Sequence, residues 1–227
     1  MREQVEVDRL SQVVNFASTV REGIPDTTGW RGGGTFTVKL MYDWWVSKDN
    51  ASMNLSKFIW NPLAPPRVQC FGWLVCLGRV KTAEVLLNCE FFTMDEAMFC
   101  FCGEELESTD HLFLHCRRVW KIWSACLKWW GVCWVAPKSI YEVLMWWRDV
   151  RSSKLAGIVW KLIPLAVLWT VWRWRNGLIF NNVQPQWELA MDVVVRRTAI
   201  WAKNHAGLKE YSLHDLMVNT HAVIGMG

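Results

Sequence analysis

Several motifs that are typical of enzymes are missing from this 227-residue chain. No Asp-Asp dyad occurs, although polymerases use paired carboxylates to hold two metal ions, and the acidic residues are scattered along the chain. The sequence also lacks a Gly-x-Ser-x-Gly motif, a His-Glu-x-x-His motif and a phosphate-binding loop. These absences predict that the chain is not an enzyme, because it lacks the catalytic carboxylates of a polymerase, ribonuclease H or endonuclease.

The chain also lacks a recognisable signal peptide, because its first six residues are too polar to form an apolar core. We therefore expect its eight cysteines to be reduced thiols or metal ligands rather than disulfides. One apolar run, residues 155–172, approaches the length of a membrane span, but it contains Lys161 and Pro164. We expect a buried core helix there, with a kink or a restart at the proline, and no membrane partner.

The composition, 52% hydrophobic and 20% charged with 18 tryptophans, is that of a globular protein. The residue pattern predicts a mainly α-helical fold with a small β-hairpin at residues 26–38, where three glycines separate two short stretches. An apolar stripe predicts one helix from Ser108 or Thr109 to Trp130. A charge cluster near residue 150 suggests a boundary between a domain at 1–150 and a helical C-terminal extension at 151–227.

Residues 99–116 contain three cysteines and two histidines, the side chains that zinc prefers in proteins. The predicted ligand set is Cys100, Cys102, His111 and Cys116. His111 and Cys116 are five residues apart and do not share a regular helical face, so His111 must lie in a cap or a distorted first turn. His115 is an alternative to Cys116, and a buried free cysteine on the apolar stripe is the reading without a metal.

Basic residues next to this segment and between later tryptophans are candidates for binding nucleic acid. They are Arg117, Arg118, Lys121, Arg173 and Arg175, the last two interleaved with Trp172 and Trp174. Arginines can hold phosphates while exposed aromatic rings stack on bases, which suggests RNA or single-stranded DNA as a partner. In the competing interpretation, the tryptophans are core residues and the arginines only face solvent.

Several blocks occur in the order found in one known family. They are Gly34–Lys39, Trp60 to Trp73, Gly78–Thr82, Cys102–Cys116 and Trp169–Phe180. With them the sequence resembles the zinc-binding domain that follows the polymerase in plant LINE-type (non-LTR) reverse transcriptases. The resemblance places the family's first cysteine at position 99, which is a phenylalanine here. Either Cys100 replaces it through a backbone shift, or the site has three protein ligands.

The resemblance implies a bound Zn²⁺ and a non-catalytic module of a retrotransposon reverse transcriptase, with residues 1–150 as the zinc-binding domain. It implies that the module assists template binding. The alternative is a structural or protein-interaction module, or a degenerate relic, that packs against a polymerase domain and binds no nucleic acid.

Overall fold

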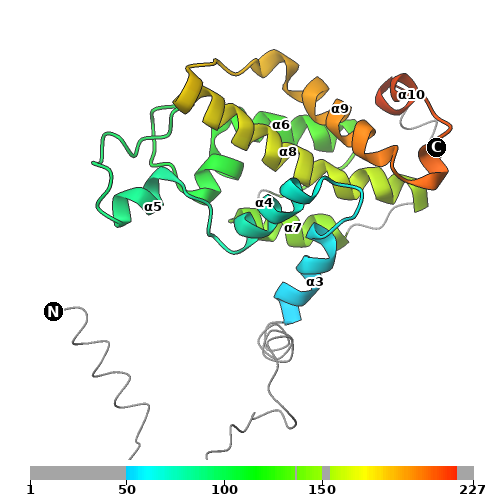
Figure 1. Ribbon diagram of the computed structural model, residues 1–227, viewed down its shortest axis with the longest axis horizontal. Helices are drawn as coiled ribbons and strands as arrows, with labels where there is room; N and C mark the ends of the chain where they lie inside the picture. The colour runs from blue at the N-terminus through cyan, green and yellow to red at the C-terminus, as the bar shows by residue number, and fades with distance from the viewer. Residues whose placement is uncertain (1–49, 136, 150–153, 219–227) are drawn as a thin grey trace, which may run out of the picture. The chain divides into compact units, whose positions relative to one another are not determined.

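A computed structural model describes residues 50–135, 137–149 and 154–218 (Figure 1). The helices of these ranges are α3 (Asn50–Ile59), α4 (Pro66–Cys76), α5 (Ala83–Asn88), η2 (His111–His115), α6 (Arg117–Trp129), α7 (Ile140–Asp149), α8 (Lys154–Asn181), η3 (Trp187–Leu189), α9 (Ala190–Ala202), η4 (Ala206–Leu208) and α10 (Leu213–Val218). No strand occurs in these ranges, which confirms the mainly helical prediction; an isolated antiparallel bridge joins Met98 to Leu106. The predicted hairpin at 26–38 lies outside the described residues.

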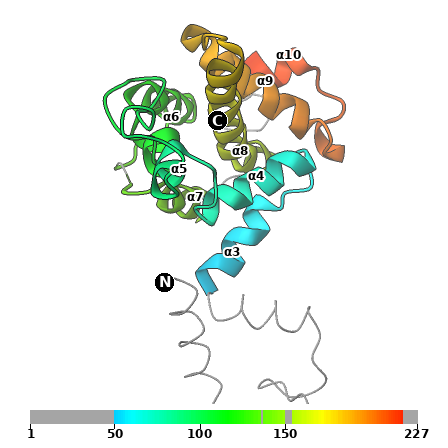
Figure 2. The same ribbon diagram turned by 60° about the vertical axis from the view of Figure 1, so that its left-hand side comes forward.

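The long helix α8 is the centre around which the others pack, with α4, α6, α7 and α9 all in contact with it (Figure 2). By length and composition alone it could cross a membrane, but 67% of its apolar window is buried by the rest of the protein. The expected core helix is therefore present. Gly72 of α4 permits close packing, because a Cβ atom there would lie 2.7 Å from Leu165 Cδ2 of α8.

Helix α8 continues through Pro164 without the restart that the sequence suggested. A proline has no N–H, so the carbonyl of residue 160, four positions earlier, loses its helical hydrogen bond. The indole N–H of Trp147 donates to that carbonyl at 2.9 Å, and the indole of Trp160 donates to the carbonyl of Trp147 at 2.8 Å. This reciprocal pair satisfies the carbonyl that the proline leaves without a partner and fixes α7 against α8.

Much of the tryptophan excess belongs to the core. The stacked rings of Trp147 and Trp160 lie 4.3 Å apart, and Trp123 of α6 is 5.4 Å from Trp147. All three side chains are fully buried, and the indole N–H of Trp123 donates to the carbonyl of Phe113 at 2.8 Å. Tryptophan suits such a core because it combines a large apolar surface with one donor that can reach a backbone oxygen.

The hydrophobic core is continuous across position 150. Buried residues of α4, α6 and α7 belong to the same cluster as those of α8 and α9. The described residues on both sides of this position also belong to one compact unit. In this part of the chain, the boundary predicted near residue 150 does not separate two cores.

Candidate metal centre

A tight turn after Phe99 positions Cys102. The backbone N–H groups of Cys102 and Gly103 both donate to the carbonyl of Phe99, at 3.3 and 2.8 Å. Gly103 has a φ of +68°, a left-handed conformation that glycine adopts at little cost. The turn is closed by Phe99 N–H donating to the carbonyl of Glu105 at 2.8 Å. The glycine after Cys102 therefore allows the turn that positions this cysteine.

The helix predicted from Ser108 to Trp130 is divided in two, and the division brings His111 and Cys116 together. Ser108 Oγ accepts the N–H of His111, as expected for a residue at a helix start. Residues His111–His115 then form a π-helix, in which the N–H of Cys116 donates to the carbonyl of His111 at 3.0 Å. Cys116 is non-helical and α6 begins after it. The wider π-helical turn brings side chains that are five residues apart to the same face, which a regular α-helix cannot do.

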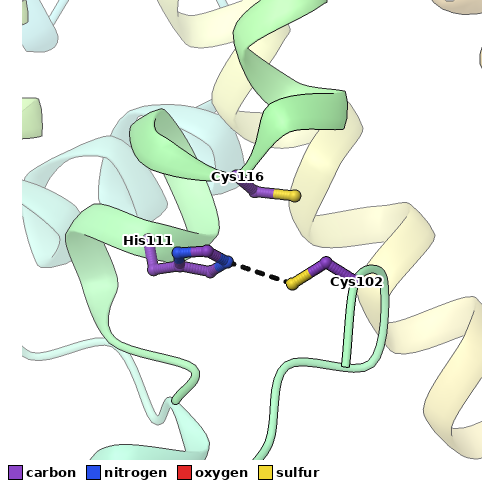
Figure 3. A group of neighbouring side chains, drawn as sticks. All are labelled: Cys102, His111 and Cys116. Atoms are coloured by element: carbon purple, nitrogen blue, oxygen red, sulfur yellow. Dashed lines mark hydrogen bonds between the residues drawn. The ribbon is translucent and has the colours of Figure 1, made fainter. Parts of the chain in front are cut away.

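Cys102, His111 and Cys116 converge from the turn and from the two ends of the π-helix (Figure 3). Their ligand atoms lie within 4.8 Å of one another, and Cys102 Sγ is 3.3 Å from His111 Nε2. Ligand atoms around a tetrahedral zinc lie about 3.5–3.8 Å apart, given the usual bond lengths. Two sulfurs and an imidazole at this spacing fit a zinc ion, and the fit requires only small movements of the side chains.

The surroundings of the cluster suit a metal ligand set. Burial raises the pKa of the Cys116 thiol, while the backbone N–H groups of Arg118 and Val119 oppose that shift. These N–H groups belong to the first turn of α6, whose positive end favours a thiolate over a thiol. A bound cation would favour the thiolate further.

The second nitrogen of His111 faces a carboxylate. Glu105 Oε2 lies 2.8 Å from His111 Nδ1, yet the two are not aligned as a hydrogen bond, and this buried nitrogen has no hydrogen-bond partner among the described residues. A zinc-bound histidine usually donates its other N–H to a carboxylate or carbonyl group, which fixes the tautomer. A small rotation of the exposed Glu105 side chain would complete that arrangement.

The structure does not bring the other two candidate ligands into the cluster. Cys100 is exposed and lies outside the group, and His115 is exposed at the end of the π-helix. Phe99, at the position of the family's first cysteine, is fully buried, with its ring centroid 5.2 Å from that of His111. A phenyl ring thus occupies space next to the imidazole where the resemblance places a fourth ligand.

Glu107 is a site-forming residue whose role the sequence did not reveal. Its carboxylate accepts hydrogen bonds from Arg175 Nε and Nη2 at 2.6 to 3.1 Å and from the backbone N–H of Ala83 at 3.0 Å. Glu107 and Arg175 are both buried. The carboxylate therefore joins the metal segment to α8 and also caps α5, because the side chain of the N-cap residue Thr82 makes no capping hydrogen bond. Its arginine partner lies 68 residues away, a separation that no local motif reveals.

The candidate nucleic-acid residues occupy different environments. Arg117, Arg118 and Lys121 are exposed at the start of α6, directly after Cys116, and Arg118 lies over the ring of Trp187 at 5.5 Å. Arg173 is exposed on α8, whereas Arg175 is buried in its pair with Glu107. The interleaved rings are half-buried, Trp172 stacking on Phe71 and Trp174 packing against Trp187.

Comparisons with known proteins agree with the metal segment. Residues 36–123 match the family model described as zinc-binding in reverse transcriptase, and all three converging residues lie inside this match. The match confirms the resemblance, so this segment is of the zinc-binding reverse-transcriptase type and Zn²⁺ is its cofactor.

A protein of Arabidopsis thaliana named "Putative ribonuclease H protein At1g65750" is 26% identical over 167 residues, which are 70% of this chain. The chain spans 26% of the length of that relative. No solved structure matches the chain.

Proposed function

We propose that the chain is a non-catalytic, zinc-stabilised module of a reverse-transcriptase-type protein, and that it binds RNA or single-stranded DNA for a polymerase. Cys102, His111 and Cys116 hold the zinc. The ion links the turn after Phe99 to the start of α6, and its chemistry there is structural. The observation that carries the proposal is the convergence of these three ligands inside a zinc-binding segment of the reverse-transcriptase type.

The basic start of α6 supports the nucleic-acid role. Arg117, Arg118 and Lys121 are all exposed there, and the first turn contains no acidic residue. Cations at a helix N-terminus are unfavourable for stability, because the helix dipole is positive at that end. Their presence is therefore better explained by an anionic partner than by helix stability. The zinc site holds the start of this helix in place.

The test is fluorescence anisotropy with a labelled single-stranded oligonucleotide, RNA or DNA, at rising salt. The double variant Arg117→Gln/Lys121→Gln removes two charges at the start of α6, and Lys128→Gln at the end of the same helix is the matched control. We expect binding that weakens with salt, reduced by about ten-fold or more in the double variant, with Lys128→Gln close to wild type. An absence of binding by the wild type at low salt refutes the nucleic-acid role.

The rival function is docking to a protein partner. Phe91 and Met94, on the loop after α5, are 76% and 60% exposed, which is unusual for side chains of this size. This rival predicts self-association in gel filtration, or binding to a polymerase domain, with no affinity for the oligonucleotide. The same protein sample in the two assays separates the two functions.

A further inference from the structure

One cavity, whose lining includes none of the three residues of the metal cluster, is lined by three arginines. It has a volume of about 230 Å³ and lies between α4, α8 and α9. Its charged lining consists of Arg67 from α4, Arg173 from α8 and Arg197 from α9, and its aromatic lining consists of Trp169 and Trp201. Residues 67 and 197 are far apart in sequence, so only the fold creates this cluster.

Two of the arginines are held in place by neighbouring side chains. The guanidinium of Arg67 lies over the ring of Trp169 at 5.7 Å, a cation–π contact. Arg197 is half-buried and donates from Nη1 to Thr170 Oγ1, whose hydroxyl in turn donates to the carbonyl of Ala166. Such a preorganised pair loses less conformational entropy when it binds a ligand than two mobile surface arginines would.

In the part of the chain that the structure describes, no carboxylate balances these charges. None of the three arginines forms an ion pair with a described residue, and the cavity lining contains no acidic side chain. Helices α4 and α8 contain no Asp or Glu, and the single acid of α9, Asp192, lines a different cavity beside Lys128 and Trp129. Burial and the charges of Arg173 and Arg67 lower the pKa of Arg197, so the charges interact.

We propose that this cavity, here called the arginine pocket, binds a backbone phosphate of a single-stranded nucleic acid. Arginine forks match the oxygens of a phosphate group, and three of them can surround one. The pocket also lies at the first turn of α4, where the helix dipole adds positive potential. Trp169 forms an aromatic wall of the pocket and holds Arg67 in place through the cation–π contact. This proposal rests on the proposed nucleic-acid function and locates a second contact for the strand, separate from the start of α6.

The test compares neighbouring arginines of α9 in the oligonucleotide anisotropy assay. Arg197→Gln changes the pocket, whereas Arg196→Gln changes an exposed residue outside its lining by the same charge. We expect Arg197→Gln to weaken binding by about ten-fold or more and to reduce the salt slope by about 0.7, and Arg196→Gln to leave both almost unchanged. Arg173→Gln changes an exposed position of the pocket, so this variant should keep its fold and show the same loss of affinity as Arg197→Gln. Thermal melts of all three variants check that each is folded.

Each outcome separates the pocket from the wider function. If Arg196→Gln and Arg197→Gln lose equal affinity for the oligonucleotide, diffuse surface charge explains the binding. If Arg197→Gln and Arg173→Gln keep wild-type affinity, the pocket is not a binding site. Either result refutes this inference and leaves the proposed function intact. No oligonucleotide binding by the wild type refutes both. A final competition compares polyglutamate with inorganic phosphate, added at the same concentration of negative charge. If polyglutamate displaces the oligonucleotide as well as inorganic phosphate does, the pocket recognises acidic protein segments and the inference is wrong.

Discussion

The buried pair of Glu107 and Arg175 gives a sharp prediction about stability. The carboxylate accepts hydrogen bonds from the guanidinium and from the N–H of Ala83, and its side chain is 1% exposed. Glu107→Gln keeps the volume, so no cavity forms, but it leaves the buried guanidinium without its negative partner. We expect the free energy of unfolding to fall by about 3–5 kcal/mol, the usual effect of removing one member of a buried ion pair.

Urea unfolding of the zinc-loaded protein, followed by tryptophan fluorescence, measures this change. Glu104→Gln is the matched control, because Glu104 is three residues from Glu107 but is exposed, and its replacement should cost under about 0.5 kcal/mol. The double variant Glu107→Leu/Arg175→Met should recover much of the loss, since apolar pairs of similar volume can replace buried ion pairs. A loss below about 1 kcal/mol for Glu107→Gln would contradict the energetic role given to the pair.

Three further changes probe the metal site and the core. Glu105→Gln should lower zinc affinity about 10- to 100-fold in a chelator competition, because the Glu105 carboxylate, once rotated, would accept the Nδ1 proton of zinc-bound His111 and orient the ring; an unchanged affinity would rule that out. Phe99→Cys should raise zinc affinity at least about ten-fold by adding a fourth ligand, although the apo protein should lose about 3–5 kcal/mol of core packing; an unchanged affinity would mean that position 99 does not face the ion. Trp147→Phe should cost about 1–3 kcal/mol in unfolding measurements, because the carbonyl of Trp160 loses its donor; wild-type stability would contradict that role.

Local patterns in the sequence were sufficient to predict much of the helical fold. Ser139 and Glu142 have the spacing of a capping motif, and a helix does start there: α7 begins at Ile140, and the N–H of Glu142 donates to Ser139 Oγ. The apolar run at 155–172 was correctly expected to be a core helix. Its behaviour at Pro164 could not be predicted, because the compensating donor, the indole of Trp147, belongs to another helix.

The metal segment was predictable only in part, because some of its geometry depends on contacts that the local sequence does not contain. The need for a distorted first turn at His111 followed from its spacing to Cys116, but a π-helix is too rare to be inferred from the residues alone. The spacing could not decide whether Cys100 joins the cluster, because that depends on which side of the turn is buried. Arg175 looked like a surface residue between two tryptophans, and its carboxylate partner became visible only in three dimensions.

Zinc content measured by mass spectrometry on purified protein tests most directly the claim that Cys102, His111 and Cys116 hold the ion. The wild type should contain about one zinc per chain, the number that a single site holds. Cys102→Ser should lose it, whereas Cys100→Ser, which changes an exposed thiol two residues away, should retain it. Full zinc content in Cys102→Ser, or loss of zinc in Cys100→Ser, would contradict this ligand set.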